Sequence, residues 1–128
     1  MLRTSVIVAA SFIAGVSAVQ VLHAQGKAPV FSVSVIDIKD NDGYKNAVPD
    51  VRKRIADMGG KYLVAAGVAG SGEMMVDGDK APSRLVVTEW ANMDAYKKWW
   101  TEAGEKDIKM LHQYTNSFKL YAAEGIAK

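Results

Sequence analysis

The chain has 128 residues, a formal net charge of +2 and no cysteine. This length suggests a single domain, and the small charge excess argues against nucleic acid or an acidic membrane surface as a partner. The lack of cysteine excludes disulfides, thiolate nucleophiles, iron–sulfur clusters and cysteine-bound zinc.

Residues 1–24 have the layout of a secretory signal peptide. One basic residue, Arg3, precedes an apolar run that extends to Leu22, and the small residue Ala24 offers a cleavage site. A second possible site follows Ala18. Because the apolar run approaches the length that spans a bilayer, a retained membrane anchor is the alternative. We expect cleavage near Ala24, release from the membrane, and a periplasmic or secreted protein.

The remaining chain predicts a short linker at 25–29, one domain at 30–125 and a C-terminal tail at 126–128. Within the domain, β-branched and alternating segments predict strands, and these are residues 30–38, 61–68, 84–91 and 117–125. The turn-rich segment before residue 84 has a short apolar centre, which predicts a hairpin arm or edge strand at 73–76. The strand at 84–91 is apolar at nearly every position, so we expect it to be central and covered on both faces.

Two segments have the apolar periodicity of amphipathic helices. In the first, apolar residues recur from Tyr44 to Met58, after a turn at 39–43. Pro49 lies inside this pattern, which predicts either a kink or a main helix that starts near the proline. Asn92 is the expected N-cap of the second helix, which is interrupted at Gly104.

The order β-α-β-β-α-β predicts an α+β, ferredoxin-like fold, with helices on one face of an antiparallel four-stranded sheet. The other sheet face would then be bare. Several of its candidate residues are apolar, namely Ile36, Val86 or Val87, and Tyr121. An apolar face of that size is unusual on a monomer, so we expect a homodimer in which two sheets face each other.

Four stretches carry a family resemblance: "YKNAVPDV", "GGKYLVAAG", "DGDKAPSRLVVTEWANMDAYKKWW" and "FKLYAAEG". Together they resemble the bacterial domain-of-unknown-function family 1330, of the dimeric α/β-barrel superfamily. The resemblance implies the fold and the dimer, and it implies no established reaction. Relatives in the wider superfamily include cofactor-independent monooxygenases and haem-degrading enzymes, which is an analogy of fold alone.

The sequence motifs predict no metal site and no cofactor. "GVAGSG" has the wrong glycine order for a dinucleotide fingerprint. "DIKDNDGYKNAVP" lacks the first and last ligands of a calcium loop. After cleavage His112 is the one remaining histidine, so a site with several histidine ligands is excluded.

Candidate ligand-binding residues lie on the predicted strands and on the second helix, and they are Tyr62, Arg84, Glu89, Trp90, His112 and Tyr121. Arg84 and Glu89 are five residues apart on one strand and so point to opposite faces, which prevents an acid–base pair within a monomer. Each candidate also has an ordinary structural explanation: an ion pair at a strand end, or packing in the core.

Three functions stay open at this point. The first is an exported, dimeric domain that binds a small apolar ligand or a partner. The second is a cofactor-independent enzyme, resembling a monooxygenase or an isomerase, on a small organic substrate. That activity needs Arg84, Glu89 and His112, or a tyrosine, to converge on one cavity. The third is a haem-binding protein with His112 as the axial ligand.

Overall fold

The computed structural model describes residues 27–78 and 80–126. The predicted signal peptide, Asp79 and the last two residues lie outside this part. The elements follow in the order β1 (Val30–Ile38), α2 (Asn41–Asp57), β2 (Lys61–Gly67), β3 (Arg84–Trp90), α3 (Met93–Trp99), the π-helical turn η1 (Trp100–Gly104), α4 (Glu105–His112) and β4 (Thr115–Glu124).

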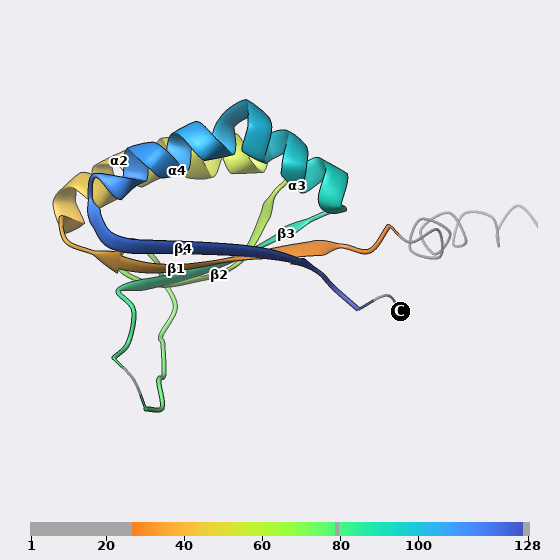
Figure 1. The fold of residues 1–128 in the computed structure, drawn as a ribbon. Helices are drawn as coiled ribbons and strands as arrows, with labels where there is room; N and C mark the ends of the chain where they lie inside the picture. The colour runs from red at the N-terminus through yellow and green to blue at the C-terminus, as the bar shows by residue number, and fades with distance from the viewer. Residues whose placement is uncertain (1–26, 79, 127–128) are drawn as a thin grey trace, which may run out of the picture.

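The strands form one four-stranded sheet in the order β2-β3-β1-β4, and neighbouring strands are antiparallel. The helices form a layer on one face of this sheet (Figure 1). This arrangement is ferredoxin-like, which confirms the predicted fold. No helix in the two described ranges combines the length and the apolar character needed to cross a bilayer.

Helix α2 starts earlier than the sequence predicted. It begins at Asn41 because Asp40 caps it, with the Asp40 carboxylate accepting a hydrogen bond from the backbone N–H of Gly43 at 2.9 Å. The predicted turn at 39–43 and the predicted start near Pro49 are therefore wrong. Pro49 lies inside the helix, which continues because buried side chains on both sides of it pack in the core, namely Tyr44, Val48, Val51 and Ile55.

The second helical segment confirms the predicted N-cap and explains the interruption. The Asn92 side chain accepts a hydrogen bond from the backbone N–H of Ala95 at 2.9 Å. The segment then continues through η1 into α4 instead of breaking. At Gly104 a Cβ atom would lie 2.8 Å from the Trp99 ring, so the close approach of the ring requires glycine there.

The segment between β2 and β3 has no strand at 73–76, and that prediction is wrong. Its one ladder contact is an isolated bridge between Ala66 and Gly72. The rest projects from the sheet on the side away from the helices (Figure 1), and the Met75 residue is 97% exposed. A strand needs a neighbour for its backbone groups, and among the described residues of one copy no strand pairs with residues 73–76.

The two sheet faces alternate as predicted, and of the residues expected on the bare face only Ile36 is wrongly placed, with Val87 rather than Val86 on that face. Ile36 and Val86 lie under the helices, whereas Val87 and Tyr121 lie on the opposite face. Strand β3 is central, but its odd-numbered residues are only partly buried, so it is not covered on both faces. A two-residue repeat shows which residues share a face without showing which face receives the helices.

Candidate functional site

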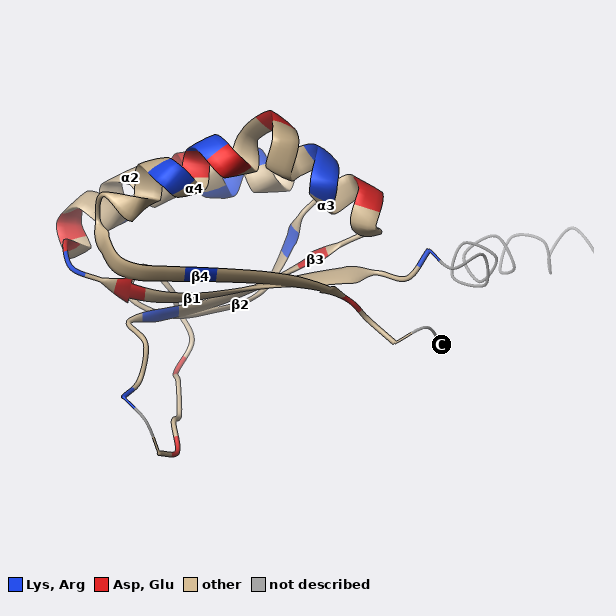
Figure 2. Ribbon diagram, in the orientation of Figure 1, with Lys and Arg blue, Asp and Glu red and all other residues tan. Residues whose placement is uncertain are grey.

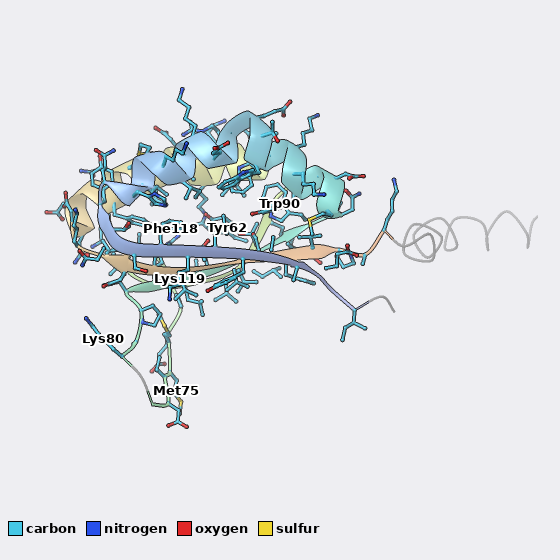
Figure 3. The ribbon with its side chains drawn as sticks, in the orientation of Figure 1. Tyr62, Met75, Lys80, Trp90, Phe118 and Lys119 are labelled. Atoms are coloured by element: carbon cyan, nitrogen blue, oxygen red, sulfur yellow. The ribbon has the colours of Figure 1, made fainter. Side chains whose placement is uncertain are left out.

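A small cavity lies between the helix layer and the covered face of the sheet. Its volume is about 30 Å³, enough for about two water molecules. Figure 3 shows Tyr62 and Phe118 between the two layers, where they line this cavity. Its roof is supplied by α2 and α4 and consists of Tyr44, Val48, Val51, Ile55, Ile108 and Leu111.

The floor of the cavity is unusually polar for the inside of a two-layer fold. Ser32 is aligned with Thr88 across β1 and β3, and Thr88 with Tyr62 across β3 and β2, so three oxygen-bearing side chains cross the sheet in one row. Ser34 follows on the same face of β1. The Ser32 hydroxyl accepts a hydrogen bond from the Trp90 indole at 3.2 Å.

Arg84 lies at the edge of this polar floor. The residue is 1% exposed. Its Nη1 donates a hydrogen bond to the carbonyl of Val68 at 2.9 Å, and its guanidinium carbon is 5.7 Å from the centre of the Tyr44 ring. Its buried Nε has no hydrogen-bond partner among the residues described. The site therefore contains a cation that the surrounding side chains satisfy only in part.

Both cavity phenols are protonated at neutral pH. Burial raises the pKa of Tyr44 to about 12, although the positive charge of Arg84 acts in the opposite direction. Burial also raises the pKa of Tyr62, again against the charge of Arg84. A protonated phenol can donate or accept a hydrogen bond but is a poor general base. The site is thus suited to holding a polar group.

An ion pair joins the two helices that roof the cavity. Arg54 of α2 donates from Nε and a terminal nitrogen to the two carboxylate oxygens of Asp107 in α4, each at 2.8 Å. The Asp107 side chain is 9% exposed and that of Arg54 is 45% exposed. Figure 2 shows acidic and basic residues interspersed along this helix layer. Two parallel hydrogen bonds fix the spacing of the helices above the cavity.

The structure brings together only part of the predicted site. Tyr62 lines the cavity and Arg84 lies beside it. Trp90 instead packs in the core, with its ring 5.1 Å from Trp99 and 5.9 Å from Tyr96. Trp90 is therefore a core residue and does not line the cavity.

The other three predicted site residues lie elsewhere. Glu89 pairs with Phe31 and Lys61 on the uncovered sheet face, and Tyr121 is 58% exposed on the same face. His112 is exposed at the end of α4, with its ring 5.7 Å from that of Phe118. Arg84, Glu89 and His112 therefore do not converge on one cavity.

Sequence reasoning missed the four residues besides Tyr62 that bring a hydroxyl group to the cavity: Ser32, Ser34, Tyr44 and Thr88. A signal was present, because Ser32 and Ser34 alternate with valines in β1 and share its covered face. That alternation looks like the solvent side of a strand. Within 27–78 and 80–126, no three histidine, aspartate or glutamate side chains gather in a way that could hold a metal ion.

A family model decides the identity of the domain. The model described as "Domain of unknown function (DUF1330)" matches residues 29–126. The chain belongs to the DUF1330 family. The resemblance inferred from the sequence motifs is thereby confirmed. No curated protein matches the chain.

Solved structures share the fold of this DUF1330 domain at low sequence identity. A protein of unknown function from Rhodopseudomonas palustris matches with a TM-score of 0.61 and 12% identity, over 78% of this chain and 84% of that one. SnoaB, a cofactor-independent oxygenase from Streptomyces nogalater, matches with a TM-score of 0.55 and 12% identity, over 79% and 96%. At this identity the similarity concerns the fold alone.

Proposed function

We propose that this DUF1330 protein is a homodimeric binding domain for a small organic ligand, which enters between the helices and the covered face of the sheet. The observation that carries the proposal is the cavity itself, with hydroxyl groups on its floor and aliphatic side chains in its roof. Small-molecule sites combine an apolar wall with a few convergent polar groups in this way. The present volume of about 30 Å³ means that side chains must move to admit a ligand.

Binding is favoured over catalysis because the cavity lacks an acid or base suited to neutral pH. Its titratable groups are phenols with raised pKa values, and Glu89 and His112 lie outside it. The oxygenase SnoaB has a similar fold, but a fold does not specify a reaction. The haem hypothesis gains no support either, because His112 is exposed and does not line this cavity.

The proposed dimer joins the uncovered sheet faces of two copies. This face carries a continuous set of partly buried or exposed apolar side chains: Phe31, Val33, Val35, Val64, Leu85, Val87 and Tyr121. Apolar patches of this kind mark association surfaces, and a sheet packed on a sheet buries both. The segment with Met75 projects on the same side (Figure 3), where it would flank a second copy.

Export is part of the proposal and depends on the sequence of residues 1–24. A basic start, an apolar run and Ala24 are the features that support it. Amino-terminal sequencing of protein from the periplasmic fraction tests it, and a chain that starts near Gln25 is expected. A mature chain that still begins at Met1 would contradict cleavage.

Native mass spectrometry of the protein purified from its producing cells tests the binding and the dimer together. We expect a mass of two copies, plus a small molecule that is lost on gentle activation. A monomer without a ligand, which also binds nothing in a screen of small organic acids, alcohols and amides, would contradict the proposal. A monomer that binds such a compound would contradict the dimer alone.

A further inference from the structure

The group beside the cavity that calls for explanation is the Arg84 guanidinium. It is almost completely removed from solvent, and a guanidinium does not release its proton. Three ion pairs are found within the described ranges, and they are Lys53–Asp57, Arg54–Asp107 and Lys109–Glu105. Arg84 takes part in none of them. A buried charge without a counter-ion costs several kcal/mol. Burying Arg84 for a structural role alone would therefore lower the free energy of unfolding.

The contacts that Arg84 makes are all with neutral groups. One nitrogen donates to the carbonyl of Val68, which follows β2, and the guanidinium carbon lies over the Tyr44 ring, 5.7 Å from its centre. The guanidinium also interacts with the hydroxyls of Tyr44 and Tyr62. A neutral amide side chain could make the same contact to a carbonyl without burying a charge. The unpartnered Nε is a charged donor in a site shielded from water, where an arriving anion would be bound strongly.

The neighbours of Arg84 would assist an anion. The guanidinium acts on both Tyr44 and Tyr62, and both phenols line the cavity. As protonated phenols they can each donate a hydrogen bond to a negatively charged oxygen. No acidic residue lines the cavity, so nothing there repels a carboxylate. The other wall of the cavity is aliphatic and comes from α2 and α4, for example through Val51 and Leu111.

We propose that the ligand of this cavity is the anion of a small aliphatic carboxylic acid. Its carboxylate binds Arg84 and the hydroxyls of Tyr44 and Tyr62, and its hydrocarbon chain lies against the aliphatic side chains of α2 and α4. This inference rests on the proposed binding function and specifies the class of ligand. A single planar guanidinium matches one carboxylate, and the limited space favours a short chain over a bulky, multiply charged phosphate.

The test compares butanoate with butanamide, which has nearly the same shape but no charge. Each is titrated into the purified protein at pH 7, and binding is followed by calorimetry and by amide chemical shifts in ¹H–¹⁵N NMR spectra. We expect butanoate to bind at least about tenfold more tightly, the fold-change that corresponds to 1.4 kcal/mol. The largest shifts are expected at Tyr44, Tyr62 and Thr88. Acetate and hexanoate measure the chain length that fits, and inorganic phosphate is expected not to bind.

Variants separate binding from structural support. Arg84→Gln should reduce the preference for butanoate over butanamide to about one, and Arg84→Lys should retain part of it. Lys53→Gln is the matched control, because it removes an exposed cation from α2 and should leave the preference unchanged. If Arg84→Gln fails to fold, Arg84→Lys and the comparison of the two ligands on the natural protein still decide the question.

Three results would overturn the inference, and they have different consequences. Equal binding of butanoate and butanamide in the cavity would contradict the carboxylate and leave the proposed binding function intact. If no acid or amide from two to six carbons shifts a cavity resonance, the inference and the proposed ligand cavity both fail. Retention of the butanoate preference in Arg84→Gln would also contradict the role of Arg84.

Discussion

The two faces of the sheet differ in what covers them, and each departs at some positions from the usual pattern of a two-layer protein. The face under the helices carries Ser32, Ser34, Thr88 and the cation of Arg84. The face without helices is largely apolar, with side chains such as Val87 only partly buried. Polar groups normally lie on the solvent side and apolar groups under the helices. The rest of the covered face is apolar core, with Ile36, Val86 and Trp90 buried, so its polar row is a local exception. We propose that this row receives a ligand and that the apolar part of the uncovered face receives a second copy.

The largest expected effect comes from a charge on the uncovered face. Val87→Asp places a carboxylate at the centre of the proposed interface, twice in a symmetric dimer, where it is buried without a partner. We expect the dimer dissociation constant to rise at least about a thousandfold, or about 4 kcal/mol. Analytical ultracentrifugation measures this. Asn46→Asp adds the same charge to the exposed surface of α2 and should leave the dimer unchanged. Undiminished association of Val87→Asp would place the interface elsewhere.

The next effect concerns the roof over the covered face. Asp107→Asn removes the charge that binds Arg54 and weakens the connection between α2 and α4. Because Arg54 is half exposed, we expect a loss of about 1.5 kcal/mol in the free energy of unfolding, measured in urea. Glu105→Gln is the control, since its pair with Lys109 is exposed and 3.5 Å long. An equal loss in both variants would show that the ion pair in the roof has no special role.

The pH dependence of stability tests how closely Tyr44 is enclosed. Its folded pKa of about 12 lies above the value of about 10 in an unfolded chain. The folded state therefore keeps a proton that the unfolded state releases. Stability is complete below pH 10 and declines as the pH rises toward 12, by about 1 kcal/mol between pH 10 and 11 for this group. Urea denaturation should show a shallower decline for Tyr44→Phe than for the natural protein. If the free energy of unfolding of Tyr44→Phe declines with pH as steeply as that of the natural protein, the Tyr44 phenol is not buried as described.

The smallest effect is expected at the segment that projects beside the uncovered face. Met75 is almost fully exposed in one copy. If the segment flanks a second copy, Met75→Asp should raise the dimer dissociation constant about threefold, or about 0.7 kcal/mol. Ligand binding in the cavity should be unchanged. Asp77→Asn, on the same segment, serves as the control for a change of charge. No change in the dissociation constant of Met75→Asp would show that the segment stands clear of the partner.

The order of strands and helices could be predicted because it depends on local patterns. Strand β1 has the predicted limits, and Asn92 caps the helix as expected. The start of α2 was missed because Pro49 suggested a boundary, while the capping carboxylate of Asp40 lay in an apparent turn. The strand predicted at 73–76 failed because pairing with a neighbour, which local sequence does not reveal, decides whether a strand forms.

The site was harder to predict than the fold for a physical reason. Arg84 and Tyr62 were identified as candidates, but Ser32, Ser34 and Thr88 look like solvent-facing residues until the helices are placed over them. Tyr44 looks like an ordinary apolar helix position. A site assembled from four strands and two helices depends on which face the helices cover, and the two-residue period of a strand leaves that open.

A crystal structure of the protein grown with butanoate tests the contrast between the two faces most directly. We expect two copies to meet through their uncovered faces, with Val87 at the centre, and a carboxylate beside Nε of Arg84 under the helices. Butanoate bound on the apolar face, or uncovered faces left open to solvent beside a cavity without the carboxylate, would contradict the account.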